Sequence, residues 1–218
     1  MTDPVTILWF KRDLRVVDHP ALASVRGPVI PLYIAEPEMW GQADASARQW
    51  HFVAESLAEL RAELAALGAP LVVRRGAAVQ VLEILRQSHP VRRLVSHQET
   101  GLLWSWDRDK RVAAWCAAHG IVWGEPPDSG VVRRLASRDG WAARRELFVR
   151  EPLAPVPDRL ISVDVPPGDI PSAETLGLTG DPCPERQAGG RARGLELLYT
   201  FLHDRGEGYR RDMSSPIA

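Results

Sequence analysis

The chain has 218 residues, 45% of them hydrophobic and 25% charged, which is typical of a soluble globular protein with one ordinary domain and additional segments. Its 27 lysines and arginines nearly balance 28 aspartates and glutamates, so the net charge of −1 gives no overall attraction to a nucleic acid. No run of about 18 apolar residues predicts a membrane span, and the distant Cys116 and Cys183 indicate neither a zinc site nor a disulfide framework, which fits a reducing cytoplasm.

Short apolar runs alternate with helical patterns through the first two-thirds of the chain. Continuous apolar runs of this length are typical of strands that are covered on both faces of a parallel sheet. The predicted strands are Val5–Phe10, Val29–Ala35, Leu71–Arg74, Arg93–Ser96 and Ile121–Trp123.

The segments between these strands have helical periodicity. From Ala47 to Leu67 the apolar residues recur at alternating spacings of three and four, which places them on one face of a helix. Asp44 or Ser46 can cap the start of this helix, and Gly68 can end it. Further helices are predicted at Ala77–Gln87 and Asp107–His119. The alternation predicts an α/β fold, a Rossmann-like five-stranded parallel sheet with helices on both faces.

The composition changes after residue 130. Between Gly130 and Arg150, six arginines face one aspartate and one glutamate, a local charge of about +4. Pro152–Pro184 is rich in proline, glycine and aspartate, and we expect a long linker that runs over a surface. Helical periodicity returns at Gly190–Asp204.

The loop after the first strand is charged rather than glycine-rich. Lys11, Arg12, Asp13 and Arg15 stand where a GxGxxG loop would bind a dinucleotide, and no P-loop, GxSxG or HExxH motif occurs elsewhere. The histidines show no metal-ligand spacing, and no metal site is predicted. Charged groups at a strand's carboxyl end can orient a polar ring or a phosphate. The alternative is an ion-pair cluster that fixes the loop against a neighbouring element.

Several stretches resemble the photolyase/cryptochrome family. Trp9–Leu22, with the sequence WFKRDLRVVDHPAL, is similar to the family's W-F-[RK]-x-D-L-R-x-x-D-[NH]-x-A-L opening. Further similar stretches follow in the family's order at Arg48–Leu64, Leu71–Leu85, His97–Val112, Glu185–Leu202 and Tyr209–Pro216. One departure is Gln187-Ala188 before the two linker glycines, where the family often has a proline.

The resemblance implies an antenna-type α/β domain over residues 1–130, a connecting segment and linker over 131–189, and the truncated start of an FAD-binding helical domain over 190–218. In this family reduced FAD, excited by blue light, passes an electron to a pyrimidine dimer in DNA, and the α/β domain often holds a folate, deazaflavin or flavin antenna. The resemblance thus implies the N-terminal part of a deoxyribodipyrimidine photolyase. Damaged DNA would bind the missing helical domain, so this chain alone is expected to be inactive and to hold no catalytic residue.

Three alternatives to the photolyase interpretation stay open. Cryptochromes use the same photochemistry for signalling, and no residue present here separates the two functions. A stand-alone flavin- or nucleotide-binding module has a similar sheet. A scaffold domain without a ligand would show a filled pocket at Lys11 to Asp13.

The resemblance also implies candidate binding residues, because antenna pockets in similar proteins lie at the carboxyl ends of the strands. They are Phe10, Lys11, Arg12 and Asp13, then Ile34 and Glu36, then Arg48 and His51, and finally Gln98, Glu99, Asp107 and Arg108. Tyr209 matches a tyrosine that contacts FAD in the family. The alternative for many of these charges is packing against the missing domain. The pairs Arg133-Arg134 and Arg144-Arg145 are expected to form a solvated or ion-paired face, or else to contact DNA or the helical domain.

Overall fold

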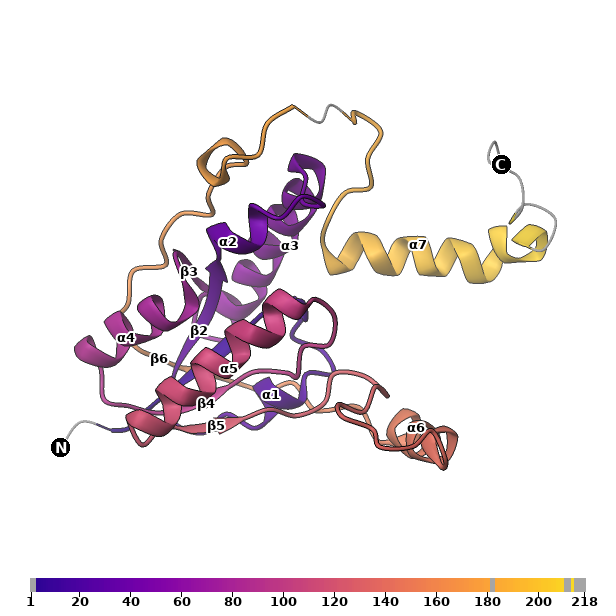
Figure 1. The fold of residues 1–218 in the computed structure, drawn as a ribbon. Helices are drawn as coiled ribbons and strands as arrows, with labels where there is room; N and C mark the ends of the chain where they lie inside the picture. Colours follow the sequence, from indigo (N-terminus) through magenta and orange to yellow (C-terminus); the bar gives the residue numbers. More distant parts are fainter. Residues whose placement is uncertain (1–2, 181–182, 210–212, 214–218) are drawn as a thin grey trace.

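A computed structural model describes residues 3–180, 183–209 and 213, and its centre is a parallel sheet (Figure 1). The strands are β1 (Val5–Phe10), β2 (Pro28–Ala35), β3 (Val72–Arg75), β4 (Val91–Val95) and β5 (Val122–Gly124), in the order β3-β2-β1-β4-β5. The predicted Rossmann-like order is therefore confirmed. Strands β2 and β3 are added on one side of β1, and β4 and β5 are added on the other. The strand order therefore reverses between β1 and β4.

Strand β1 is buried on both faces, and its side chains alternate between two cores. Leu8 and Phe10 point to the core under helix α3 (Ala47–Ala66), while Ile7 and Trp9 point to the opposite core. Helices α4 (Ala78–Ser88) and α5 (Leu103–Ala118) cover that second face. The short helices α1 (Pro20–Ala23) and α2 (Pro37–Trp40) follow β1 and β2. Helices thus lie on both faces, as predicted.

Helix α3 follows its sequence signals closely. Ser46 forms a capping box with Gln49, and Gly68 follows the last turn with a φ of +105° that favours glycine. Asp44, the other proposed cap, lies in the loop before it. Helix α5 instead begins at Leu103, four residues before the predicted Asp107, and no side chain caps its start.

The linker is built into the α/β layer rather than only lying over it. Its short strand β6 (Ile161–Ser162) pairs in parallel with the start of β2, and Leu160 donates its N–H to the carbonyl of Leu67 at 2.7 Å. Four linker side chains are buried in the core with α3: Leu160, Ala173, Leu176 and Leu178. A 3₁₀ turn, η1 (Glu174–Leu176), carries one of them. We call residues 152–180 the strap.

Two helices lie away from the sheet (Figure 1). Helix α6 (Trp141–Arg150) was not predicted, whereas α7 (Arg191–His203) matches the predicted Gly190–Asp204 and is followed by the 3₁₀ turn η2 (Arg205–Gly208). Neither α6 nor α7 has a buried residue. Among the helices of the described ranges, none combines the length and the apolar character needed to cross a membrane.

Candidate functional site

The carboxyl ends of β1, β2 and β4 bring charged side chains together at one edge of the sheet. Lys11 to Asp13 follow β1, Glu36 follows β2, and His97 to Glu99 follow β4. Helix α5 adds Arg108 and Asp109, which are 3% and 5% exposed. This is the edge at which ligands bind in doubly wound sheets, beside the point where strand order reverses.

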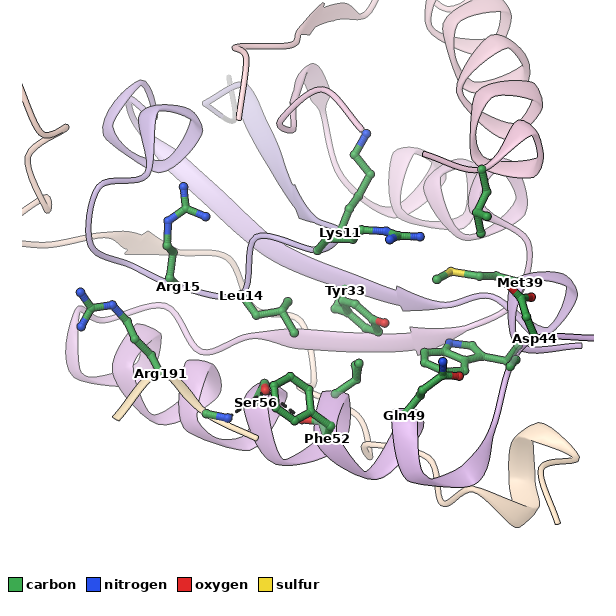
Figure 2. A pocket seen from close by; sticks show the side chains of 16 residues that line it. Lys11, Leu14, Arg15, Tyr33, Met39, Asp44, Gln49, Phe52, Ser56 and Arg191 are labelled. Carbon is green, nitrogen blue, oxygen red and sulfur yellow. Dashed lines mark hydrogen bonds between the residues drawn. The ribbon is translucent and has the colours of Figure 1, made fainter. Parts of the chain in front are cut away.

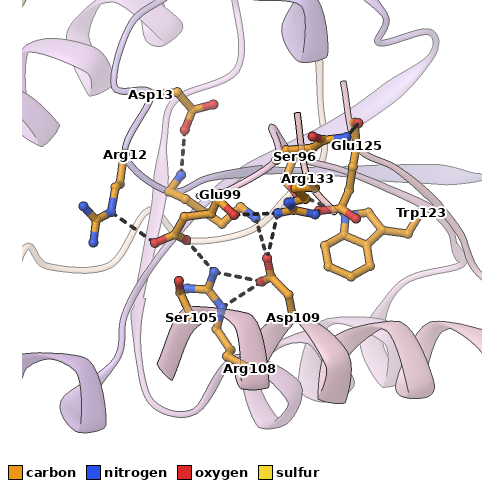
Figure 3. Close-up of polar contacts among 12 residues, drawn as sticks. Arg12, Asp13, Ser96, Glu99, Ser105, Arg108, Asp109, Trp123, Glu125 and Arg133 are labelled. Atoms are coloured by element: carbon orange, nitrogen blue, oxygen red, sulfur yellow. Dashed lines mark hydrogen bonds and ion pairs between the residues drawn. The ribbon is translucent and has the colours of Figure 1, made fainter. Parts of the chain in front are cut away.

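Arg108 is the centre of a buried ion network (Figure 3). Its guanidinium donates to Glu36 at 2.9 Å, to Glu99 at 2.6 Å and to Asp109 at 2.8 Å. Burial would lower the pKa of Arg108, but the three carboxylates outweigh it and raise that pKa. Burial likewise acts to raise the pKa of Glu99, yet Arg108, with Lys11 and Arg12 nearby, holds it below its usual value.

Lys11 extends the network and is packed between aromatic rings. Its Nζ lies 3.4 Å from an oxygen of Asp109 and stands 5.0 Å from the ring centre of Trp9 and 5.7 Å from that of Trp123. Burial lowers the pKa of Lys11, with Asp109 acting against that shift. Arg108 lies 4.7 Å from the Trp9 ring centre. Two cations therefore stack on the buried Trp9 ring and find carboxylates beside them.

Asp13 is a second buried anchor at this edge. It accepts the Lys11 backbone N–H at 2.8 Å, and one of its oxygens lies 2.5 Å from Nδ1 of His97 and 2.9 Å from Nε2 of His19. Burial alone would raise the pKa of Asp13, but the two imidazoles reverse the shift and hold it far below its usual range.

Sequence spacing did not reveal the buried polar cluster of Asp13, His19 and His97, and the tautomer of His19 argues against a metal ion there. Their potential ligand atoms lie within 4.8 Å of one another. However, Nδ1 of His19 accepts the Leu22 N–H at 2.9 Å, so the Nε2 of a neutral ring carries the hydrogen that faces Asp13. A metal on that Nε2 would require the opposite tautomer and would break the cap of α1.

A groove of about 580 Å³ lies next to this charged edge, between the end of β2 and α3 (Figure 2). Its apolar and aromatic walls come from Leu14, Tyr33, Met39, Trp40 and Phe52, and its polar rim from Lys11, Arg12, Arg15, Asp44, Gln49, Ser56 and Arg191. The volume falls within the range of about 300–1,000 Å³ that is typical of small-molecule sites.

One buried donor without an acceptor belongs to a residue that lines this groove. The indole Nε1 of Trp40 has no hydrogen-bond partner among the described residues, although its side chain is 6% exposed. Burial raises the pKa of the neighbouring Tyr33 phenol, which keeps that hydroxyl protonated. A buried unpaired N–H costs about 1–3 kcal/mol, so a ligand atom that accepts from it would be stabilising.

The structure divides the candidate residues into separate environments. Phe10, Lys11, Arg12, Ile34, Glu36, Glu99 and Arg108 line one shared cavity, but it measures only about 10 Å³ because the ion network fills it. Of the candidates, Lys11 and Arg12 also line the large groove. For the residues around this filled cavity, the structure agrees with the alternative that the charges form an ion-pair cluster.

The remaining candidates lie outside the groove. Arg48 and His51 are exposed on α3, whose groove-facing positions are Gln49, Phe52, Val53 and Ser56. Gln98 donates to the Glu125 carbonyl, and the exposed Asp107 pairs with Lys110. Tyr209 is exposed, with its ring 5.6 Å from that of Phe201, and most of the stretch that follows it lies outside the described residues.

The junction between strap and α7 closes one end of the groove. Carboxylates of α3 and a serine replace the missing side-chain cap of α7: Gly189 N–H donates to Glu55 at 2.7 Å, Gly190 N–H to Ser56 at 2.9 Å, and Ala192 N–H to Glu59 at 2.9 Å. A Cβ at Gly189 would lie 2.0 Å from the Phe52 carbonyl oxygen. The approach therefore requires glycine.

Comparisons with known proteins agree with this architecture. The family model described as DNA photolyase matches residues 6–137, which is more than half of the chain. A deoxyribodipyrimidine photo-lyase of Vibrio cholerae is 32% identical over 134 residues, covering 58% of this chain and 28% of the relative. A cryptochrome DASH of Gloeobacter violaceus is 28% identical over 226 residues, covering 93% of this chain and 45% of the relative.

A solved structure shows the same fold. The archaeal photolyase from Sulfolobus tokodaii with two FAD molecules superposes with a TM-score of 0.69 at 23% identity, over 89% of this chain and 46% of that one. The chain thus spans less than half the length of these relatives. On the match to the family model, with which the sheet order agrees, the chain belongs to the DNA photolyase family.

Proposed function

We propose that this chain is the N-terminal half of a light-dependent, FAD-containing DNA photolyase that repairs pyrimidine dimers, and that its groove holds an antenna chromophore. The volume of the groove is compatible with a folate, a deazaflavin or a flavin. The observation that carries the proposal is the groove itself, an aromatic-walled space of about 580 Å³ lined by Trp40, whose buried Nε1 has no hydrogen-bond partner among the described residues.

The groove residues fit a flat conjugated ring with a polar or anionic tail. Tyr33, Trp40 and Phe52 offer aromatic surface on which such a ring can pack, and the Trp40 indole N–H can donate to a ring acceptor. Arg15 and Arg191 stand on the rim, where guanidinium groups bind carboxylate or phosphate oxygens. Such a chromophore, when bound, would absorb light and pass excitation to FAD.

The buried ion network has a positioning role in this proposal. Glu99 accepts from Nε of Arg12 at 3.1 Å, while Arg108 holds Glu99 from the other side. Arg12 itself is 53% exposed at the groove, so the network holds its guanidinium through Nε and leaves the two Nη groups to meet a ligand. If the domain were a scaffold without a ligand, the filled cavity inside the ion network would be the only candidate site at this edge. The adjacent open groove argues against that interpretation.

The full-length protein would act on damaged DNA through the helical half, in the cytoplasm. One observation favours a second candidate function: the cryptochrome DASH relative matches 93% of this chain. Repair of a thymine-dimer oligonucleotide by the full-length protein under blue light would separate the two, since a signalling cryptochrome would leave the dimer intact.

Absorption spectroscopy tests the groove. The purified chain is mixed with flavin mononucleotide, FAD, a deazaflavin or methenyltetrahydrofolate and passed through gel filtration. A near-UV or visible band that elutes with the protein, beyond the absorption of its own aromatic residues, is expected for at least one of them. Trp40→Phe, which keeps an aromatic ring but removes the N–H, should weaken that complex about two- to tenfold. No co-eluting band with any of the four would refute the antenna site.

A further inference from the structure

The basic arm, residues 130–150, concentrates positive charge on a chain that is otherwise acidic. Its six arginines against Asp139 and Glu146 give about +4, so with a total of −1 the rest of the chain carries about −5. The arm contains α6, which has no buried residue and lies apart from the sheet (Figure 1). The packing of α6 therefore does not explain its arginines.

Two of the six arginines are already neutralised within the molecule. Arg133 pairs with Glu125 at 3.1 Å and with Asp109 at 3.4 Å, which anchors the arm to the buried network. Arg150 pairs with Glu146 at 2.8 Å. Of the four arginines expected to form a solvated or ion-paired face, Arg133 is ion-paired.

The other four arginines are exposed and lack a carboxylate partner within the described part of the chain. Arg134 lies over the ring of Trp106, 5.0 Å from its centre, and Arg138, Arg144 and Arg145 make no ion pair there. Like charges held close together repel one another, so the arrangement is unfavourable unless an anion shares it.

We propose that the basic arm is a second DNA-contacting surface of this protein, which binds the phosphate backbone without reading sequence. The choice of DNA as the polyanion rests on the proposed function. The proposal for the basic arm does not depend on the chromophore groove. Guanidinium groups match phosphate oxygens in charge and in fork geometry. A membrane fits less well, because the exposed Leu147 and Val149 are two positions apart and lie on different sides of α6, leaving no apolar face.

The salt dependence of DNA binding tests this surface. Each phosphate contact contributes about −0.9 to the slope of log K against log salt, so four arginines give a slope of about −3.6. From 50 to 200 mM salt, affinity for a fluorescent 20-base-pair duplex should fall about 150-fold in the 218-residue chain. In Arg144→Gln/Arg145→Gln the slope should shrink to about −1.8, a fall of about 12-fold.

A matched control removes the same charge elsewhere. Arg75 and Arg92 are exposed, lie outside the arm, and make no ion pair among the residues described. Arg75→Gln/Arg92→Gln should keep the wild-type slope, and circular dichroism confirms that both variants are folded. Equal slopes in the two variants, or no binding at 50 mM salt, would overturn the proposal. So would equal competition by polyglutamate, which would indicate an acidic polypeptide as the partner. Because no chromophore is present, these outcomes are independent of the antenna test.

Discussion

Replacing Arg108 with methionine should be among the most destabilising single changes in this chain. The variant Arg108→Met keeps the length of the side chain but leaves Glu36, Glu99 and Asp109 buried without their shared cation. Breaking a buried ion pair by removing one partner costs about 3–5 kcal/mol. The total stability of a domain is about 5–15 kcal/mol, so the loss is a large fraction of it.

Urea unfolding measures this cost. With an m-value of about 2 kcal/mol/M, a loss of 4 kcal/mol moves the midpoint down by about 2 M. The loss should be largest near pH 7, because Glu99 owes its lowered pKa to Arg108 and becomes easier to protonate once that cation is gone. Adding Glu36→Gln and Glu99→Gln to Arg108→Met should restore part of the stability. A midpoint that moves by less than about 0.5 M, which corresponds to about 1 kcal/mol, would contradict the assigned role of the network.

Three further changes test other parts of the structure. Leu176→Ala, in the strap, should cost about 2–5 kcal/mol by leaving a cavity in the α3 core, measured by urea unfolding against the exposed Leu153→Ala as control. Asp13→Asn should lower stability at pH 7, and the deficit should shrink as the pH falls below about 4, because a carboxylate with a lowered pKa stabilises the fold only while it is ionised; a deficit that does not change with pH would contradict this. Gly189→Ala should displace the start of α7 from α3, seen as faster amide exchange at Gly190 and Ala192, and unchanged exchange would show that the close approach is not needed.

The sheet and the long helix were predictable because their signals are local. The central strands β1 and β2 are largely apolar runs, and α3 has both a regular apolar face and a Ser46–Gln49 capping box. The start of α5 was misplaced because Leu102 offers no capping side chain. The packing of the strap could not be predicted from its sequence, because its buried residues are isolated and show no periodicity. Their burial depends on tertiary contacts with Leu67 and the α3 core.

The candidate site was predictable in location but not in internal arrangement. Charged residues after parallel strands must meet at one edge, and Lys11, Glu36, Glu99 and Arg108 do. Sequence does not say whether such charges face a ligand or one another, and here they pair. On α3 the groove-facing positions include Gln49 and Phe52 rather than Arg48 and His51, a difference of one residue that turns a side chain by about 100° around the helix.

The central claim is that the groove, and not the charged cluster beside it, binds the chromophore. The most direct test compares dissociation constants for the best-binding chromophore in Phe52→Ala and His51→Ala, two neighbours on α3 of which only Phe52 lines the groove. The account predicts binding about tenfold weaker in Phe52→Ala, from lost apolar contact, and unchanged binding in His51→Ala. Equal affinities in both variants would contradict it.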